Sequence, residues 1–223
     1  MRAEGYRSNR MRRAEKNMIT CSRMQKNDIV NVVDIHLQSF QGFFLSTLGS
    51  QFLNELYSGI LIDENGIALV ARQENGQVIG FVAGTSHPNQ FYKRLLIKRW
   101  WAFAIAAIPS LLKNPRIFMR LMRAFQKPGE RTNCQSAELM SIAVHPKLQG
   151  GGAGKLLINI FIQEARSRGC QNVILTTDAL NNNPVNTFYM NCGFLLNRQF
   201  LTPENRLMNE YILRLDGISL ASG

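Results

Sequence analysis

The hydrophobic pattern of the first quarter of the chain predicts a short strand followed by two helices. Residues 18–23 have strand character, and a helix is expected to begin near Asn27 or Asp28. A second helix is expected from about Ser50 to Ile60. Apolar residues recur every three or four positions in both helices, so each helix presents one face to a core. These positions are Ile29, Val32, Val33 and Leu37 in the first helix and Phe52, Leu53, Leu56 and Tyr57 in the second.

Two β-rich runs follow, separated by the Glu-Asn-Gly-Gln sequence at residues 74–77. Asn-Gly tolerates the positive φ angles of a tight turn. Residues 66–85 therefore predict an antiparallel hairpin.

The pattern changes after Pro88. Residues 88–129 are rich in Leu, Ile, Phe, Trp, Lys and Arg and contain no acidic residue, and Pro109 and Pro115 interrupt them. The longest uncharged run, 100–112, has 13 residues, whereas a transmembrane helix needs about 20. We expect a helical insertion. Its apolar face would cover the sheet or form a homodimer contact, or its basic and aromatic residues at 91–125 would lie at a membrane surface or bind an anionic acceptor.

Strand and helix patterns alternate again in the last third of the chain. Strands are expected at 136–146 and 170–178, and helices from about Gly152 to Arg168 and at 182–192. Residues 193–202 and 206–215 then predict a closing antiparallel pair. The whole pattern describes an α/β fold in which a mixed sheet carries helices on both faces.

The net charge of +11 is unevenly distributed. Residues 1–17 hold six Lys and Arg against two acidic residues, and residues 76–129 hold nine against none, so the rest is close to neutral. We expect a disordered basic tail at 1–17, one domain at 18–215 that contains the 88–129 insertion, and a C-terminal tail at 216–223. A uniformly basic nucleic-acid-binding surface is not expected. The four cysteines lack CxxC spacing, which fits a cytoplasmic setting.

The candidate chemistry is concentrated at a glycine-rich joint between a strand and a helix. Residues 145–157 read HPKLQGGGAGKLL. The first N–H groups of a helix lack intrahelical partners and lie at the positive end of its dipole, so glycines there allow a phosphate to approach the backbone. The joint therefore predicts a phosphorylated ligand. Neither the Walker pattern GxxxxGK[ST] nor the Rossmann pattern GxGxxG fits its register.

Two motifs resemble those of the GNAT superfamily of acyl-CoA-dependent N-acetyltransferases. Gln149-x-x-Gly152-x-Gly154 resembles the pyrophosphate loop, and residues 181–194, NNNPVNTFYMNCGF, are similar to the family segment Nxx[AV]xxFYxxxGF. The resemblance covers residues 18–86 and 136–215. It implies a mixed, mostly antiparallel sheet flanked by helices, with the helical insertion between the third and fourth strands. It also implies acetyl-CoA as cosubstrate. No metal is expected, because the four cysteines lack CxxC spacing and only three histidines could join them in a metal site.

The resemblance further implies which residues bind the cofactor. Backbone groups of the strand would pair with the pantetheine arm as an added strand does. Backbone N–H groups of the glycine loop would hold the pyrophosphate, and side-chain amides would bond to the arm. The residues concerned are Ile142, Ala143, Val144, Gln149, Gly150, Gly151, Gly152, Ala153, Gly154, Lys155, Asn182 and Asn186.

The resemblance places Tyr189 beside the sulfur as general acid for the departing thiolate. Glu138 lies eleven positions before Gln149, the offset of the catalytic glutamate in the histone-acetylating branch, and is the candidate base, with a water chain as the alternative. Period-two alternation would put Glu138 on one face with Met140, Ile142 and Val144, unless a β-bulge interrupts the strand.

The acceptor region of the family corresponds here to the first helices and their loop. His36, Phe40 and Phe43 are the candidate acceptor-binding residues, and a packed His36 is the alternative. The function expected is acetyl transfer from acetyl-CoA to a primary amine of a small molecule by direct attack, because no cysteine stands in a nucleophile motif. An amino sugar or sugar nucleotide is the candidate acceptor. The alternative is a non-catalytic CoA-binding module that meets a membrane or protein through its insertion.

Overall fold

The computed structural model describes residues 19–89, 91, 94–95, 103, 105–106 and 135–215. The predicted tails at 1–17 and 216–223 and most of the predicted insertion at 88–129 lie outside these residues. The strands are β1 (Thr20–Arg23), β2 (Gly66–Arg72), β3 (Val78–Thr85), β4 (Ser136–Val144), β5 (Asn172–Asp178), β6 (Leu195–Leu201) and β7 (Leu207–Arg214). The helices are η1 (Lys26–Asp28), α2 (Ile29–Ser39), α3 (Phe44–Thr47), α4 (Gly49–Ile62), η2 (Pro146–Leu148), α7 (Ala153–Ser167) and α8 (Asn183–Asn191).

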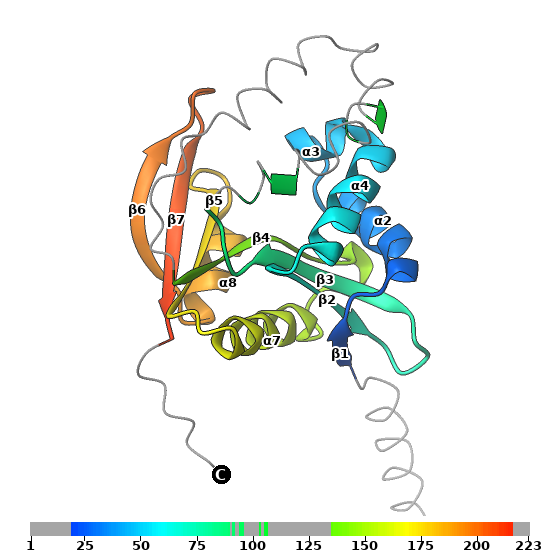
Figure 1. The fold of residues 1–223 in the computed structure, drawn as a ribbon. Helices are drawn as coiled ribbons and strands as arrows, with labels where there is room; N and C mark the ends of the chain where they lie inside the picture. Colours follow the sequence, from blue (N-terminus) through cyan, green and yellow to red (C-terminus); the bar gives the residue numbers. More distant parts are fainter. Residues whose placement is uncertain are drawn as a thin grey trace, which may run out of the picture.

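The strands form one sheet in the order β1-β2-β3-β4-β5-β7-β6 (Figure 1). Only the β4–β5 pair is parallel among the described strands, and the other pairs are antiparallel. The predicted mixed, mostly antiparallel sheet is therefore confirmed. The predicted hairpin is present too, because Gln73 N–H donates to Gln77 O at 3.0 Å and Gly76 has a φ of +81° in the turn.

Two apolar cores lie on opposite faces of the sheet. On one face, α2 and α4 pack over β2, β3 and β4, and on the other α7 packs under the same strands (Figure 1). Neighbouring strand residues divide between the two: Phe81 belongs to the α2–α4 core and Val82 to the α7 core. This alternation explains why all eight residues of β3 are buried.

Helix α2 begins after a 3₁₀ turn rather than at a side-chain cap on Asn27 or Asp28. The Asp28 carboxylate accepts a hydrogen bond from Gln25 N–H at 2.8 Å and forms an ion pair with Arg72 at 2.6 Å. Asp28 thus ties the start of the helix to the end of β2.

Strands β4 and β5 pair over four residues and then separate. The pairs run from Ser136–Asn172 to Leu139–Leu175. Beyond Leu139, β4 pairs with β3 alone. A gap therefore opens between the two parallel strands in the middle of the described sheet.

A bulge in β4 lies at the same level as this gap. Gly84 pairs with Leu139 and Ala83 with Ser141, so the bulge inserts Met140. It reverses the alternation, because Met140 packs with the α2–α4 core whereas Ile142 and Val144 pack with the α7 core. The prediction that Glu138 shares a face with Ile142 and Val144 is therefore wrong. Two positions before Met140, Glu138 lies on the α2–α4 face.

Four described residues of the insertion belong to the α2–α4 core. Phe91, Leu95, Phe103 and Ala106 are buried there. The Phe103 ring lies 5.1 Å from that of Phe52 on α4. These residues thus cover the core, as one of the alternatives for the insertion expected.

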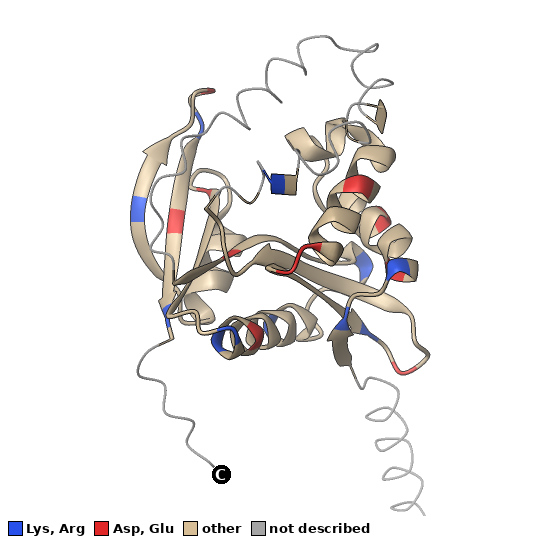
Figure 2. Ribbon diagram, in the orientation of Figure 1, with Lys and Arg blue, Asp and Glu red and all other residues tan. Residues whose placement is uncertain are grey.

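Charged residues of both signs are spread over the described elements (Figure 2). Several form ion pairs at the ends of strands and helices, such as Arg168 with Glu164 at 2.8 Å and Arg198 with Glu210 at 2.9 Å. This mixture agrees with the near-neutral balance of the sequence outside the tail and the insertion.

Candidate active site

The glycine joint lies between β4 and α7, at the end of β4 where the gap opens. Gly150 and Gly152 both have a φ of +84°, a left-handed conformation that side chains rarely adopt. A β-carbon at Gly150 or Gly152 would meet nothing within 4 Å, and at Gly151 only Leu148 O at 3.9 Å. The loop therefore presents bare backbone to open space.

The first turn of α7 adds unpaired donors to this loop. The first bond of the helix runs from Leu156 N–H to Gly152 O at 3.0 Å, so Ala153, Gly154 and Lys155 precede the intrahelical ladder. No side chain caps the helix. These three N–H groups thus lie at the positive end of the helix dipole of α7. Such a helix N-terminus is suited to bind a pyrophosphate.

The free edge of β4 continues from the loop into the gap. His145 N–H donates to Ile79 O at 2.8 Å, and the antiparallel alternation then directs Ala143 toward β3 and Ile142 and Val144 toward the gap. Ile142 and Val144 can therefore pair with an extended ligand. We revise the expectation for Ala143, whose backbone groups are used by β3. Gln149 donates to Val144 O at 3.3 Å, which braces the loop against this edge.

Tyr189 lies on α8 and is buried, with 7% of its surface exposed. Its ring packs against Phe194 and Tyr211 at 5.9 and 6.1 Å. Burial raises the pKa of its phenol above the ordinary value and keeps it protonated. Helix α8 also approaches the glycine joint, because a β-carbon on Gly154 would lie 3.3 Å from the ring of Phe188.

The two asparagines assigned to the cofactor occupy different environments. The Asn182 amide nitrogen donates to Thr177 Oγ1 and Asp178 O, at 2.8 and 3.3 Å, which leaves its carbonyl oxygen for a ligand. The Asn186 amide donates to Asp178 O and Asn182 O. Its oxygen accepts from Asn209 and from the hydroxyl of Tyr211. Because every polar atom of this buried side chain is satisfied, we revise Asn186 from a ligand-binding to a structural residue.

His36, Phe40 and Phe43 are brought together with Tyr57 on the α2–α4 side, and we call these four residues the aromatic arc. The ring centroids of His36 and Phe40 lie 4.7 Å apart, and those of Phe40 and Phe43 lie 5.7 Å apart. Nδ1 of His36 lies 2.7 Å from the Tyr57 hydroxyl, which donates to Ser141 Oγ at 3.4 Å. The arc therefore reaches β4 one residue beyond the bulge.

His36 is buried in this arc with 3% of its surface exposed, and its Nε2 is buried with no hydrogen-bond partner. Burial lowers the pKa of the imidazole from 6.5 to about 4. The structure thus shows the packed His36 that one alternative expected, and the acceptor-binding role of His36 stays a prediction.

Sequence reasoning missed the roles of four polar residues on this side. Tyr57 appeared only as a core position, and Ser141 and the Arg206–Asp178 ion pair, 2.7 Å long, were not identified. Ser141 was not predicted on this side because regular alternation assigns it to the α7 face. The bulge turns it toward α4 instead.

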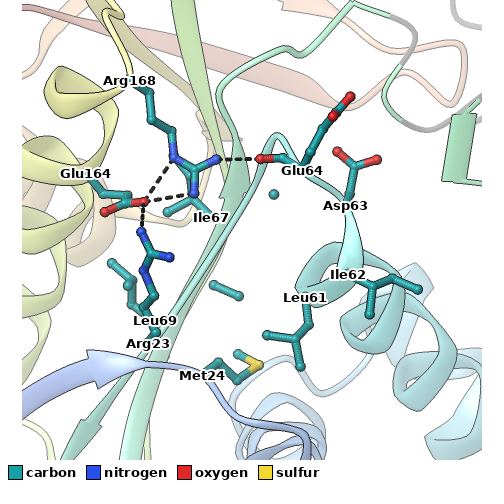
Figure 3. A pocket seen from close by; sticks show the side chains of 12 residues that line it. Arg23, Met24, Leu61, Ile62, Asp63, Glu64, Ile67, Leu69, Glu164 and Arg168 are labelled. Carbon is teal, nitrogen blue, oxygen red and sulfur yellow. Dashed lines mark hydrogen bonds and ion pairs between the residues drawn. The ribbon is translucent and has the colours of Figure 1, made fainter.

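A pocket of about 360 Å³ lies elsewhere, between the α4–β2 turn, β1 and the end of α7. Figure 3 shows Arg23 and Arg168 meeting at Glu164 on one side, with Asp63 and Glu64 on the other. None of the predicted site residues lines it. The candidate active site is therefore defined by the open loop and strand edge rather than by this pocket.

The comparisons with known proteins agree with this geometry. Residues 122–194 match the model of the acetyltransferase (GNAT) family. A putative GNAT acetyltransferase from Desulfovibrio desulfuricans is similar in structure, with a TM-score of 0.60, 16% identity, and coverage of 88% of this chain and 99% of that one. No curated protein sequence matches the chain.

Two further solved structures are similar. Ard1 from Thermoplasma volcanium has a TM-score of 0.57 and 15% identity, and the match covers 88% of this chain and 97% of the Ard1 chain. The ribosomal-protein-S18-alanine N-acetyltransferase from Escherichia coli has a TM-score of 0.54 and 15% identity, and the match covers 92% of this chain and 99% of the Escherichia coli chain. These likenesses establish the fold.

The glycine loop, the parted strands and the family match indicate an acyltransferase, and the matched family uses acetyl-CoA. The family match covers residues 122–194, and the similar structures show that the chain has the fold of GNAT acetyltransferases. Among the described residues, no helix has the length and apolar character to span a membrane, and no three His, Cys, Asp or Glu side chains are grouped as a metal site.

Proposed function

We propose that the chain transfers an acetyl group from acetyl-CoA to a primary amine of a small molecule by direct attack. The observation that carries this proposal is the meeting of three features at one end of the gap: the glycine loop, the open edge of β4 and helix α8 with Tyr189. The loop would hold the pyrophosphate through backbone N–H groups, and Ile142 and Val144 would pair with the pantetheine arm.

The reaction forms a C–N bond and breaks the C–S bond, while the amine loses a proton and the thiolate gains one. Tyr189 is the candidate donor of the second proton, and the burial that keeps its phenol protonated supports this role. Glu138 is the candidate acceptor of the first proton, directly or through water, since it lies on the face of β4 that carries Ser141 and the aromatic arc.

The cysteines support direct attack. Burial raises the pKa of the thiols of Cys21, Cys170 and Cys192, that of Cys21 to about 11. A protonated thiol is a poor nucleophile. Among the described cysteines, therefore, none is prepared to carry the acetyl group as a covalent intermediate.

The acceptor cannot be transferred from the similar structures. A chimera that includes the Vibrio cholerae enzyme is a spermidine N-acetyltransferase, whereas the Escherichia coli enzyme acetylates a ribosomal protein alanine, and each is 15% identical to this chain. An amino sugar or sugar nucleotide remains our candidate acceptor, and a cytoplasmic enzyme our expectation.

The test is acetyl-CoA-dependent thiol release across amino sugars, amino acids, polyamines and peptides, with Tyr189→Phe as the decisive variant. We expect its kcat to fall by about 10²-fold, the usual contribution of a positioned acid, with unchanged acetyl-CoA affinity. Tyr211→Phe is the matched control, because it removes a phenol hydroxyl from the same core and should reduce stability rather than kcat. Unchanged turnover in Tyr189→Phe would remove Tyr189 from the mechanism. Cofactor binding without turnover of any amine would favour a non-catalytic CoA-binding module.

A further inference from the structure

An ion pair between Arg206 and Asp178 lies at the mouth of the gap. Asp178 is the last residue of β5, and Arg206 directly precedes β7. Nε of Arg206 donates to Asp178 Oδ1 at 3.1 Å, and Nη2 donates to both carboxylate oxygens at 2.7 Å. One edge of the guanidinium is therefore fixed by the carboxylate.

A third element packs against this pair. The ring of Phe43, in the loop between α2 and α3, lies 5.7 Å from Cζ of Arg206. Phe43 belongs to the aromatic arc, whose other end meets Ser141 on β4 through Tyr57. A continuous series of contacts thus crosses the gap on the α2–α4 side, from β4 to β5.

The remaining edge of the guanidinium has no protein partner in the described part of the chain. The contacts to Asp178 use Nε and Nη2 and leave both N–H groups of Nη1, and the side chain is 39% exposed. A guanidinium held by a carboxylate along one edge and by a ring over one face presents its last donors in a fixed direction. These two remaining N–H groups can donate charge-assisted hydrogen bonds to a phosphate or a carboxylate.

We propose that Arg206 anchors an anionic group of the acceptor while the acceptor's amine reaches the open edge of β4. This inference rests on the proposed acetyl transfer and specifies its substrate class: a primary amine that also carries a phosphate or a carboxylate. Sugar phosphates and sugar nucleotides belong to the class, whereas neutral amino sugars and polyamines do not. Because the Arg206–Asp178 pair is neutral as a whole, the anchor acts through charge-assisted hydrogen bonds rather than through net charge.

The test compares acceptors that differ only in the anion. In the phosphate arm, glucosamine 6-phosphate is compared with glucosamine. In the carboxylate arm, 4-aminobutanoate is compared with butylamine. The wild type should acetylate the anionic member of at least one pair with a kcat/KM at least about tenfold higher, the effect of one hydrogen bond to a charged group. The arm with the larger ratio identifies the kind of anion.

Arg206→Gln should abolish this preference by raising KM for the anionic acceptor, with KM for acetyl-CoA unchanged. Arg206→Lys should keep part of it. The backbone bond of the hairpin, from Thr202 N–H to Arg206 O at 2.9 Å, remains in both variants. Arg198→Gln is the matched control, because Arg198 is also paired with a carboxylate, Glu210, and stacked on a ring, Phe200, but lies on β6 at the edge of the described sheet.

Three results would overturn the anchor. The first is equal kcat/KM for both members of each pair in the wild type. The second is an equal loss for both members in Arg206→Gln, as a merely structural role predicts. The third is calorimetric binding of glucosamine 6-phosphate and 4-aminobutanoate, in the presence of CoA, that Arg206→Gln does not weaken. All three leave acetyl transfer intact, whereas the proposed function fails only if no amine in any arm releases the thiol.

Discussion

The two sides of the gap between β4 and β5 offer different chemical groups to a ligand: backbone groups on one side and side chains on the other. On the cofactor side, the groups that would hold the ligand are backbone N–H and C=O groups of the glycine loop, of α7 and of the β4 edge. On the acceptor side, they are the side chains of the aromatic arc, Ser141, Arg206 and Asp178, which come from elements far apart in the sequence. A backbone site depends on conformation and tolerates many side chains, whereas a side-chain site changes with each residue. The comparison teaches that this fold can keep its cofactor while it changes its acceptor.

The largest effect is expected when a side chain is added to the glycine loop, which we infer to bind the cofactor through its backbone. Gly152→Val should raise the Kd for CoA by more than about 10²-fold, because a β-branched residue disfavours a φ of +84° and projects into the space of the pyrophosphate. Isothermal titration calorimetry with CoA measures this.

The matched control for Gly152→Val is Gly76→Val. Gly76 has a φ of +81° with equally open surroundings, but it lies in the hairpin turn, so Gly76→Val should lose a similar stability of about 1–3 kcal/mol and keep its CoA affinity. Lys155→Ala should raise the Kd less than about tenfold, because an exposed ammonium contributes about 1 kcal/mol. A larger effect of Lys155→Ala than of Gly152→Val would contradict a backbone-built site.

The second prediction concerns the acceptor side. Glu138→Gln should lower kcat/KM by about 10²-fold near neutral pH, as expected for the loss of a general base. The deficit should shrink as the pH rises, because the amine then arrives deprotonated. A pH profile of thiol release measures this, with Glu164→Gln, near the C-terminal end of α7 and away from the glycine loop, as a control of unchanged rate. A deficit that is the same at every pH would indicate a structural role.

The smallest expected effect concerns the stability of the aromatic arc. The pKa of His36 is lowered from 6.5 to about 4 in the folded chain, so the unfolded chain binds more protons between these values. The free energy of unfolding should therefore be highest above pH 6.5 and should fall by about 3 kcal/mol toward pH 4. Urea unfolding at a series of pH values measures the slope, which should be shallower in His36→Gln. An identical slope in both chains would show that His36 titrates normally.

The sequence predicts the cofactor side well and the acceptor side poorly, for a physical reason. Glycines at positive φ and a helix start lie within one short segment, so their spacing carries the information. The contact between Arg206 and Phe43 joins residues far apart along the chain, and local periodicity contains no trace of it. The face of Glu138 was mispredicted because one inserted residue, Met140, reverses the alternation of β4. Asn186 was assigned to the ligand because its partners Asn209 and Tyr211 lie on β7, outside the motif that names it.

The position of β7 has a consequence for the synthesis of this protein. It is the last described strand to leave the ribosome, yet it lies between β5 and β6. Until it emerges, β6 has no described strand to pair with, Asn186 lacks two of its partners, and the ring of Tyr189 lacks Tyr211. The candidate proton donor is therefore assembled after the cofactor loop. We therefore expect catalytic competence only after β7 has joined the sheet.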